Sequence, residues 1–210
     1  MKKSALILAL LIGLVMTHEE DIFLGESHKP GFVEYPNGDD MFYWLLYSRR
    51  NPTTDPLTIY LQGGPGCSSL VSTFFENGPF HINDDLSLRK NPFSWNNNAN
   101  LLYVDQPVGV GFSSVASTDH YRTDEDGVAQ DFYYFLEKFI EDNPEFKGRD
   151  FYLTGVSYAG HYVPAIAAYY LKQEVQSLNL KAIAIGDGWT DPINQYKSYP
   201  GFSLENKLIE

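Results

Sequence analysis

A single serine in DFYLTGVSYAGHYVPAIAAYY, residues 150–170, separates an apolar run from a helix-like stretch. Gly155 lies two positions before Ser157, and Ala159 lies two positions after it. A serine hydroxyl becomes a useful nucleophile when it is exposed and a base takes its proton. A strained strand–helix turn gives that exposure, and it needs small residues at these two positions because strand and helix pack closely there. The spacing therefore fits either a catalytic serine or a structural turn.

A glycine-rich loop, QGGPGCSS at residues 62–69, follows an apolar segment upstream of this serine. The tetrahedral intermediate of acyl transfer needs two backbone N–H donors, one after the nucleophile and one from an earlier glycine-rich loop. Tyr158 and Gly64 are the candidates for these two donors. A phosphate-binding loop is excluded because no Lys-Ser/Thr pair follows the glycines. Residues 109–111, GVG, lack the third glycine of a dinucleotide-binding fingerprint.

The segments around these motifs predict alternating strands and helices. A β-hairpin is expected within residues 31–50, around the Asn-Gly pair at positions 37 and 38. The alternation predicts an α/β fold with a mostly parallel sheet, helices on both faces and chemistry at the carboxyl ends of the strands. The expected strands are residues 57–61, 100–105, 151–154 and 181–185, and the expected helices are residues 124–143, capped by Thr123, and 159–173.

The composition, 43% hydrophobic and 15% aromatic in 210 residues, is typical of a globular protein. Lys2 and Lys3 precede an apolar run, residues 5–16, which has signal-sequence length and falls short of the roughly 18 residues that span a bilayer. We predict a signal peptide at residues 1–17, one domain at residues 18–210 and no stable membrane anchor. The formal net charge of −12 argues against nucleic acid or an anionic membrane as a partner.

Five ordered segments over most of residues 31–195 resemble the serine carboxypeptidase family: LTIYLQGGPGCSS, ENGPF, NPFSWNNNANLLYVDQPVGVGFS, TGVSYAGHYVP and IGDGWTDP. The resemblance implies an α/β-hydrolase fold, a Ser–Asp–His triad and removal of C-terminal residues from peptides at acidic pH, in lysosomes, vacuoles or secretions. It implies neither a cofactor nor a metal ion. By position it assigns the role of nucleophile to Ser157 and the oxyanion hole to Gly64 and Tyr158. It assigns binding of the substrate's terminal carboxylate to Gln62, Gly63 and Glu76.

Two residues depart from the family pattern at the carboxylate site. Val156 stands where the family usually has Glu, and Gln62 stands where it usually has Asn. Gln62 still carries an amide donor, whereas the side chain of Val156 cannot form a hydrogen bond. We therefore expect weak or altered specificity for the substrate's terminal carboxylate. An acyltransferase related to the same family, which accepts an alcohol instead of water, therefore stays open beside the peptidase.

The partners of the serine are not evident in this sequence. None of the five histidines stands in a triad-base motif, and His161, on the helix leading away from Ser157, is interpreted as a surface or packing residue. The resemblance places the triad Asp and His, a covering helical insertion, the last strands and a disulfide partner for Cys67 downstream. We therefore expect an N-terminal portion of the family domain, and an inactive fragment or pseudo-enzyme stays open. The oligomeric state is not indicated.

Overall fold

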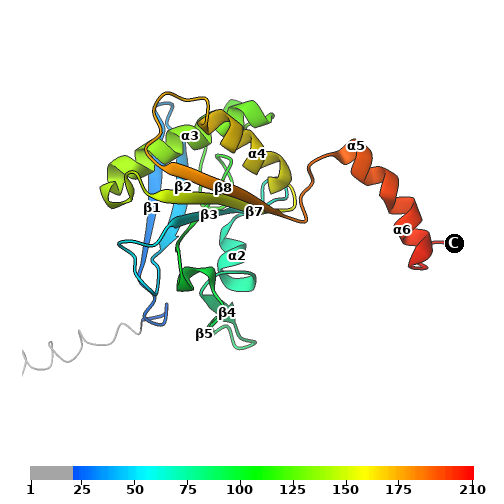
Figure 1. Cartoon of the computed structure of the whole chain (residues 1–210), viewed down its shortest axis with the longest axis horizontal. Helices are drawn as coiled ribbons and strands as arrows, with labels where there is room; N and C mark the ends of the chain where they lie inside the picture. The colour runs from blue at the N-terminus through cyan, green and yellow to red at the C-terminus, as the bar shows by residue number, and fades with distance from the viewer. Residues whose placement is uncertain (1–20) are drawn as a thin grey trace, which may run out of the picture.

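The computed structural model describes residues 21–210, so the predicted signal peptide lies outside the described residues. Its centre is a six-stranded sheet with the strand order β1-β2-β6-β3-β7-β8 (Figure 1). The strands from β6 to β8 in this order run parallel, while β1 and β2 are antiparallel. The bounds are β1 His28–Glu34, β2 Asp40–Leu46, β3 Leu57–Leu61, β6 Asn100–Val104, β7 Asp150–Val156 and β8 Asn179–Gly186.

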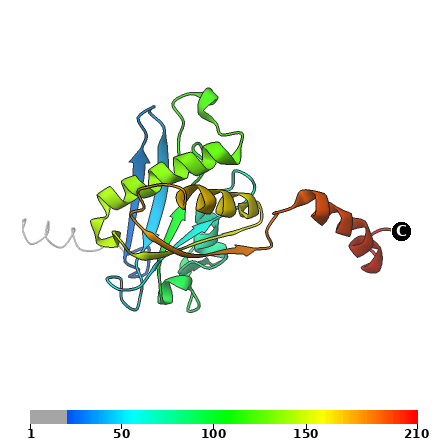
Figure 2. The same cartoon turned by 45° about the horizontal axis from the view of Figure 1, so that its top comes forward.

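Helices lie on both faces of this sheet, as predicted. Figures 1 and 2 show α3 and α4 side by side over one face, with α2 and a small β4–β5 hairpin on the other side. The segments α5 and α6 extend away from the sheet. The bounds are α2 Leu70–Phe75, α3 Glu125–Asp142, α4 Ala159–Tyr170, α5 Pro192–Gln195, α6 Tyr199–Glu205, β4 Phe80–Ile82 and β5 Leu88–Lys90. Short 3-10 turns are η1 Trp95–Asn97, η2 Thr118–His120, η3 Pro144–Phe146 and η4 Tyr196–Ser198.

The predicted helix over residues 124–143 is confirmed as α3, but its predicted cap is wrong. Asp124, not Thr123, caps the helix, because its carboxylate accepts a hydrogen bond from Gly127 N at 2.8 Å. The apolar side of α3 is buried against the sheet and α4, which explains why its 3.6-residue periodicity was a reliable signal. Its buried apolar residues are Val128, Ala129, Phe132, Phe135, Leu136, Phe139 and Ile140.

The predicted hairpin and strands are also confirmed. The β1–β2 hairpin pairs His28 with Leu46 and Glu34 with Asp40 around the Asn-Gly turn. Both β3 and β6 are buried along their whole length, in agreement with their continuous apolar sequences. Within residues 21–210, no helix is long and apolar enough to cross a membrane.

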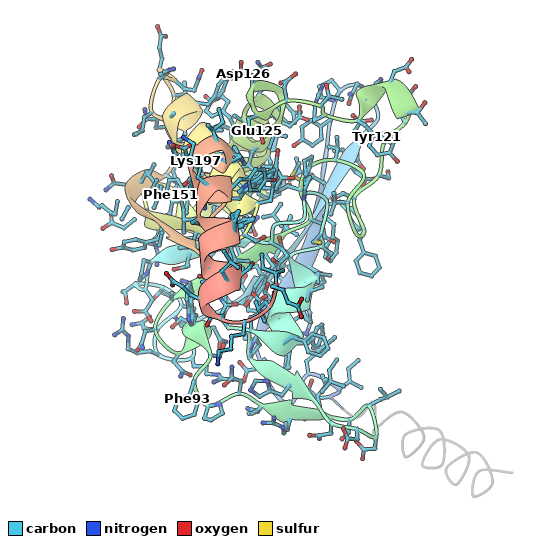
Figure 3. The ribbon with its side chains drawn as sticks, turned by 90° about the vertical axis from the view of Figure 1, so that its right-hand side faces the viewer. Phe93, Tyr121, Glu125, Asp126, Phe151 and Lys197 are labelled. Carbon is cyan, nitrogen blue, oxygen red and sulfur yellow. The ribbon has the colours of Figure 1, made fainter. Side chains whose placement is uncertain are left out.

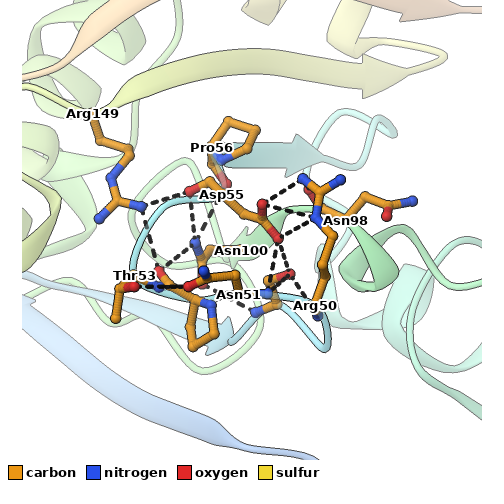
Figure 4. Close-up of polar contacts among 10 residues, drawn as sticks. Arg50, Asn51, Thr53, Asp55, Pro56, Asn98, Asn100 and Arg149 are labelled. Carbon is orange, nitrogen blue, oxygen red and sulfur yellow. Dashed lines mark hydrogen bonds and ion pairs between the residues drawn. The ribbon is translucent and has the colours of Figure 1, made fainter.

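A closed polar network lies at the amino ends of β3, β6 and β7 (Figure 4). The buried Asp55 carboxylate accepts hydrogen bonds from the Arg50 guanidinium and, at 2.6 Å, from Ser48 Oγ. The main-chain oxygen of Asp55 accepts from Asn100 Nδ2 at 3.0 Å and Arg149 Nη1 at 2.7 Å. The hydrogen bonds from Arg50 and Ser48 lower the pKa of Asp55 to about 2. This network joins the starts of the three strands.

Candidate active site

Ser157 forms a sharp turn between β7 and α4, at the carboxyl end of the sheet. Its φ angle is 59°, a conformation that residues with a side chain rarely adopt. Three main-chain hydrogen bonds hold the turn: Ser157 N donates to Gly186 O at 3.0 Å, while Trp189 N and Gly160 N each donate to Ser157 O at 2.9 Å. The turn leaves Ser157 exposed. The structure therefore has the strand–turn–helix geometry that the sequence predicted for this serine.

The small residues around the turn are required by close packing. A Cβ added to Gly155 would lie 2.5 Å from Ala159 Cβ and 2.9 Å from Leu61 O, both too close for a real contact. A Cβ added to Gly63 would lie 2.5 Å from Tyr158 N and 2.8 Å from Ser157 Cβ. The glycine loop after β3 therefore contacts the serine turn directly.

The backbone N–H groups of Gly64 and Tyr158 are both unpaired within the described residues, whereas Gly63 N donates to Gln62 Oε1 at 3.0 Å. Gly64 and Tyr158 also line a pocket of about 340 Å³ together with Ser157. Two free donors beside an exposed hydroxyl are what a developing oxyanion requires. The remaining lining residues of the pocket are Asp187, Trp189, Gln195, Tyr196 and Tyr199.

The candidate carboxylate-binding residues form a second group beside this loop. Gln62 Nε2 donates to Glu76 Oε1 at 2.9 Å and to Ser72 Oγ at 3.1 Å. Tyr60 Oη donates to Glu76 Oε2 at 2.8 Å, and burial together with this bond raises the pKa of the Tyr60 hydroxyl. Val156 is half-buried and packs against the apolar cluster that includes Trp44 and Tyr103.

Sequence reasoning missed Tyr60 and Ser72 as members of this group. A signal for Tyr60 was present, because residues two apart on a strand point to the same side of the sheet. Tyr60 on β3 therefore shares a side with Gln62, just past the strand's end. Ser72 carried no such signal, since its position beside Gln62 depends on how the short helix α2 packs.

Tyr158, directly before α4, and His161, in the first turn of α4, lie next to the serine turn. Tyr158 Oη donates to Glu125 Oε1 at 2.8 Å, and burial, then this bond, raises the pKa of Tyr158 to about 12. Figure 3, viewed from the side of α5 and α6, labels Glu125 at the start of α3. The His161 ring packs at 4.9 Å from the Tyr158 ring and at 5.3 Å from the Trp189 ring. Its aromatic contacts agree with a packing role.

Within residues 21–210, no side chain forms a hydrogen bond with Ser157 Oγ. The same part of the chain contains no group of three or more His, Cys, Asp or Glu side chains arranged to hold a metal ion. Cys67 is a free, exposed thiol here, next to Gly64 in the glycine loop.

Solved structures with a similar fold define the class of this protein. An α/β hydrolase from Penicillium sp. sh18 matches with a TM-score of 0.50 and 16% identity, over 86% of this chain and 53% of that chain. A prohormone-processing carboxypeptidase from Saccharomyces cerevisiae matches with a TM-score of 0.77 and 33% identity, over 91% of this chain and 44% of that chain. The fold is the α/β-hydrolase fold.

Sequence comparisons then give the family. The family model described as serine carboxypeptidase matches residues 19–210. "Serine carboxypeptidase-like 47" of Arabidopsis thaliana is 49% identical over 189 residues, 87% of this chain and 37% of the relative. "Serine carboxypeptidase S10 family member 1" of Dictyostelium discoideum is 45% identical over 174 residues, 81% of this chain and 42% of the relative. The chain belongs to the serine carboxypeptidase family, and it spans less than half the length of these two relatives.

Proposed function

We propose that this chain carries the nucleophile of a serine carboxypeptidase that releases C-terminal residues from peptides. Ser157 Oγ attacks the carbonyl carbon of the last peptide bond, and the N–H groups of Gly64 and Tyr158 bind the oxyanion. Collapse of the intermediate breaks the C–N bond, releases the C-terminal amino acid and leaves an acyl-enzyme, which water hydrolyses. The His and Asp that the family resemblance implies would take and return the proton.

One observation carries this proposal: an exposed serine at φ 59° shares a pocket with two unpaired backbone donors. A turn with a purely structural role needs neither the unpaired donors nor the exposed hydroxyl. The strained conformation of Ser157 places its side chain at the end of the strand, where a substrate can reach it.

Selection of a chain end is supported by the group beside the glycine loop. A free carboxylate needs hydrogen-bond donors, and amide and backbone groups supply them without a cation. Gln62, Gly63 and Glu76 are adjacent and interconnected. We propose that this group binds the terminal carboxylate of the substrate, and that the protein follows the secretory route to a lysosome, vacuole or the exterior.

Turnover of blocked dipeptides between pH 4 and pH 8 tests the proposal. In protein made from the complete coding sequence, Ser157→Ala should reduce kcat by about 10⁴-fold or more, because loss of the nucleophile leaves only residual catalysis. Ser87→Ala, at an exposed turn between β4 and β5, is the matched control and should keep full activity. Equal turnover by the Ser157→Ala variant and the wild-type protein would refute the assignment.

An acyltransferase of the same family is the second candidate, and Val156 favours it. This side chain adds no donor to the carboxylate-binding group, which weakens the preference for free chain ends. Supplying an alcohol acceptor with an activated acyl ester distinguishes the two. Acyl transfer that exceeds hydrolysis of blocked dipeptides supports the transferase, and dipeptide hydrolysis as the dominant reaction supports the peptidase.

A further inference from the structure

Asp105 is a buried carboxylate that the proposed chemistry does not use. It follows β6 directly, its side chain has no exposed surface, and within residues 21–210 no Lys or Arg pairs with it. Oδ1 accepts hydrogen bonds from Ser68 Oγ at 2.6 Å and Ser69 N at 3.0 Å. Oδ2 accepts from Phe112 N at 3.0 Å. Two separate loops therefore converge on one carboxylate.

The second of these loops, which contains Gly111 and Phe112, passes very close to the Asp105 carboxylate. A Cβ added to Gly111 would lie 2.0 Å from Asp105 Oδ2, so only glycine fits there. Ser113 Oγ donates to Asp105 O at 2.5 Å and accepts from Phe42 N at 2.8 Å, which anchors Asp105 to β2. Asp105 is thus held from the side of β2 and β6 and presents its carboxylate to the glycine loop.

The bonds continue from Asp105 to the glycine loop through Ser69. Ser69 N donates to Asp105, while Ser69 Oγ accepts from Gln62 N at 3.1 Å. These bonds close the loop at its base, because residues 62 and 69 are its two ends. Gly63 and Gly64 lie inside the closed loop, and Gly63 is the residue that contacts Tyr158 N.

Burying a carboxylate without a cation costs free energy, so its donors must compensate. Burial raises the pKa of Asp105, and the hydrogen bonds from Ser68, Phe112 and Ser69 oppose that rise. An amide in this place could not accept at both positions, and its NH₂ group would face an N–H or O–H donor. The site is built for a carboxylate.

We propose that Asp105 is a positioning residue, which fixes the glycine loop so that the Gly64 N–H group faces the oxyanion formed at Ser157. It acts through Ser68 and Ser69 and does not touch the substrate. This inference rests on the proposed function and adds to it a residue that fixes the position of the glycine loop. A displacement of about 1 Å in a catalytic group can cost about 10²-fold in rate.

Asp105→Asn tests this role in protein made from the complete coding sequence. We expect kcat per active site, titrated with a fluorophosphonate, to fall by about 10²-fold, with a smaller rise in KM because Gln62 shifts with the loop. Asp85→Asn is the matched control, since Asp85 Oδ1 also accepts from a serine N at 3.0 Å and a serine Oγ at 2.6 Å, both of Ser87. The control should leave kcat and KM unchanged.

Two further measurements test this role: Ser68→Ala, which also serves where Asp105→Asn does not fold, and amide hydrogen exchange in the folded proteins. Ser68→Ala removes one donor to Asp105 and should lower kcat per active site about 3- to 10-fold. The Ser69 amide should exchange faster in Asp105→Asn than in the wild-type protein. Unchanged kcat and KM per titrated site in the folded variants would overturn the positioning role. A wild-type protein without turnover or labelling contradicts the proposed function instead, and the exchange rate at Ser69 then still tests the restraint.

Discussion

The two ends of β3, β6 and β7 differ in whether their polar groups are paired. At the amino ends, Asp55, Asn100 and Arg149 pair their polar groups with one another (Figure 4). At the carboxyl ends, the Ser157 hydroxyl and the N–H groups of Gly64 and Tyr158 have no partner within the described residues. The same strands therefore begin beside polar groups that are paired with one another and end beside a hydroxyl and N–H groups without a partner in this part of the chain.

The sheet therefore places stabilising polar groups at one end and reactive polar groups at the other. Paired, buried polar groups fix the register and separation of the strands. Unpaired donors remain available for a group that is not part of the chain, which is the requirement of an oxyanion site. Asp105 lies at the carboxyl end but belongs to the first kind, because both of its carboxylate oxygens accept hydrogen bonds and two of these bonds come from the loop that carries Gly64.

Among the three substitutions that test this comparison, the largest effect is expected from filling the contact between the glycine loop and the serine turn. In Gly63→Ala the new Cβ would lie 2.5 Å from Tyr158 N, so the loop must move away from the turn. We expect kcat/KM for blocked dipeptides to fall by about 10²-fold. Gly201→Ala in α6, where a Cβ meets nothing within 4 Å, is the control. Near-normal activity of Gly63→Ala would show that the open donors do not depend on this contact.

A smaller, opposite effect is expected at Val156. In Val156→Glu an added carboxyl group, protonated at mildly acidic pH, joins the group of Gln62 and Glu76 and lowers KM for peptides with free C-termini by about 10-fold. Peptides with amidated C-termini should show no change. Val175→Glu, at an exposed position, serves as the control. An unchanged KM would mean that this position does not contact the carboxylate.

The amino-end network should affect stability and its pH dependence, with little effect on kcat. Because the pKa of Asp55 is lowered to about 2, its contribution is present above the ordinary Asp value of about 4 and is lost as the pH falls towards 2. Asp55→Asn should therefore unfold at lower urea than the wild-type protein at pH 6, and this difference should narrow at pH 3. Asp119→Asn, at an exposed position, is the control. A difference that does not change with pH would contradict the role of the ionised carboxylate.

The sequence predicted the parts of the fold that depend on local pattern. The periodicity of α3, the buried runs of β3 and β6, and the small residues around Ser157 each reflect one element or one turn. Asp105 was not predicted, because its hydrogen bonds are to Ser68 and Ser69, which lie 37 and 36 residues away in the sequence. The short elements α2, β4 and β5 were also missed, since their few residues carry too little periodicity to recognise.

Covalent labelling shows directly whether Ser157 is the activated nucleophile. A fluorophosphonate reacts with an activated serine by forming a P–O bond and releasing fluoride, and peptide mass spectrometry locates the adduct. In protein made from the complete coding sequence, we expect one adduct per chain, on Ser157, which is absent in Ser157→Ala and forms more slowly in Gly63→Ala. An adduct on another residue, or no adduct in protein that hydrolyses blocked dipeptides, would show that Ser157 is not the nucleophile.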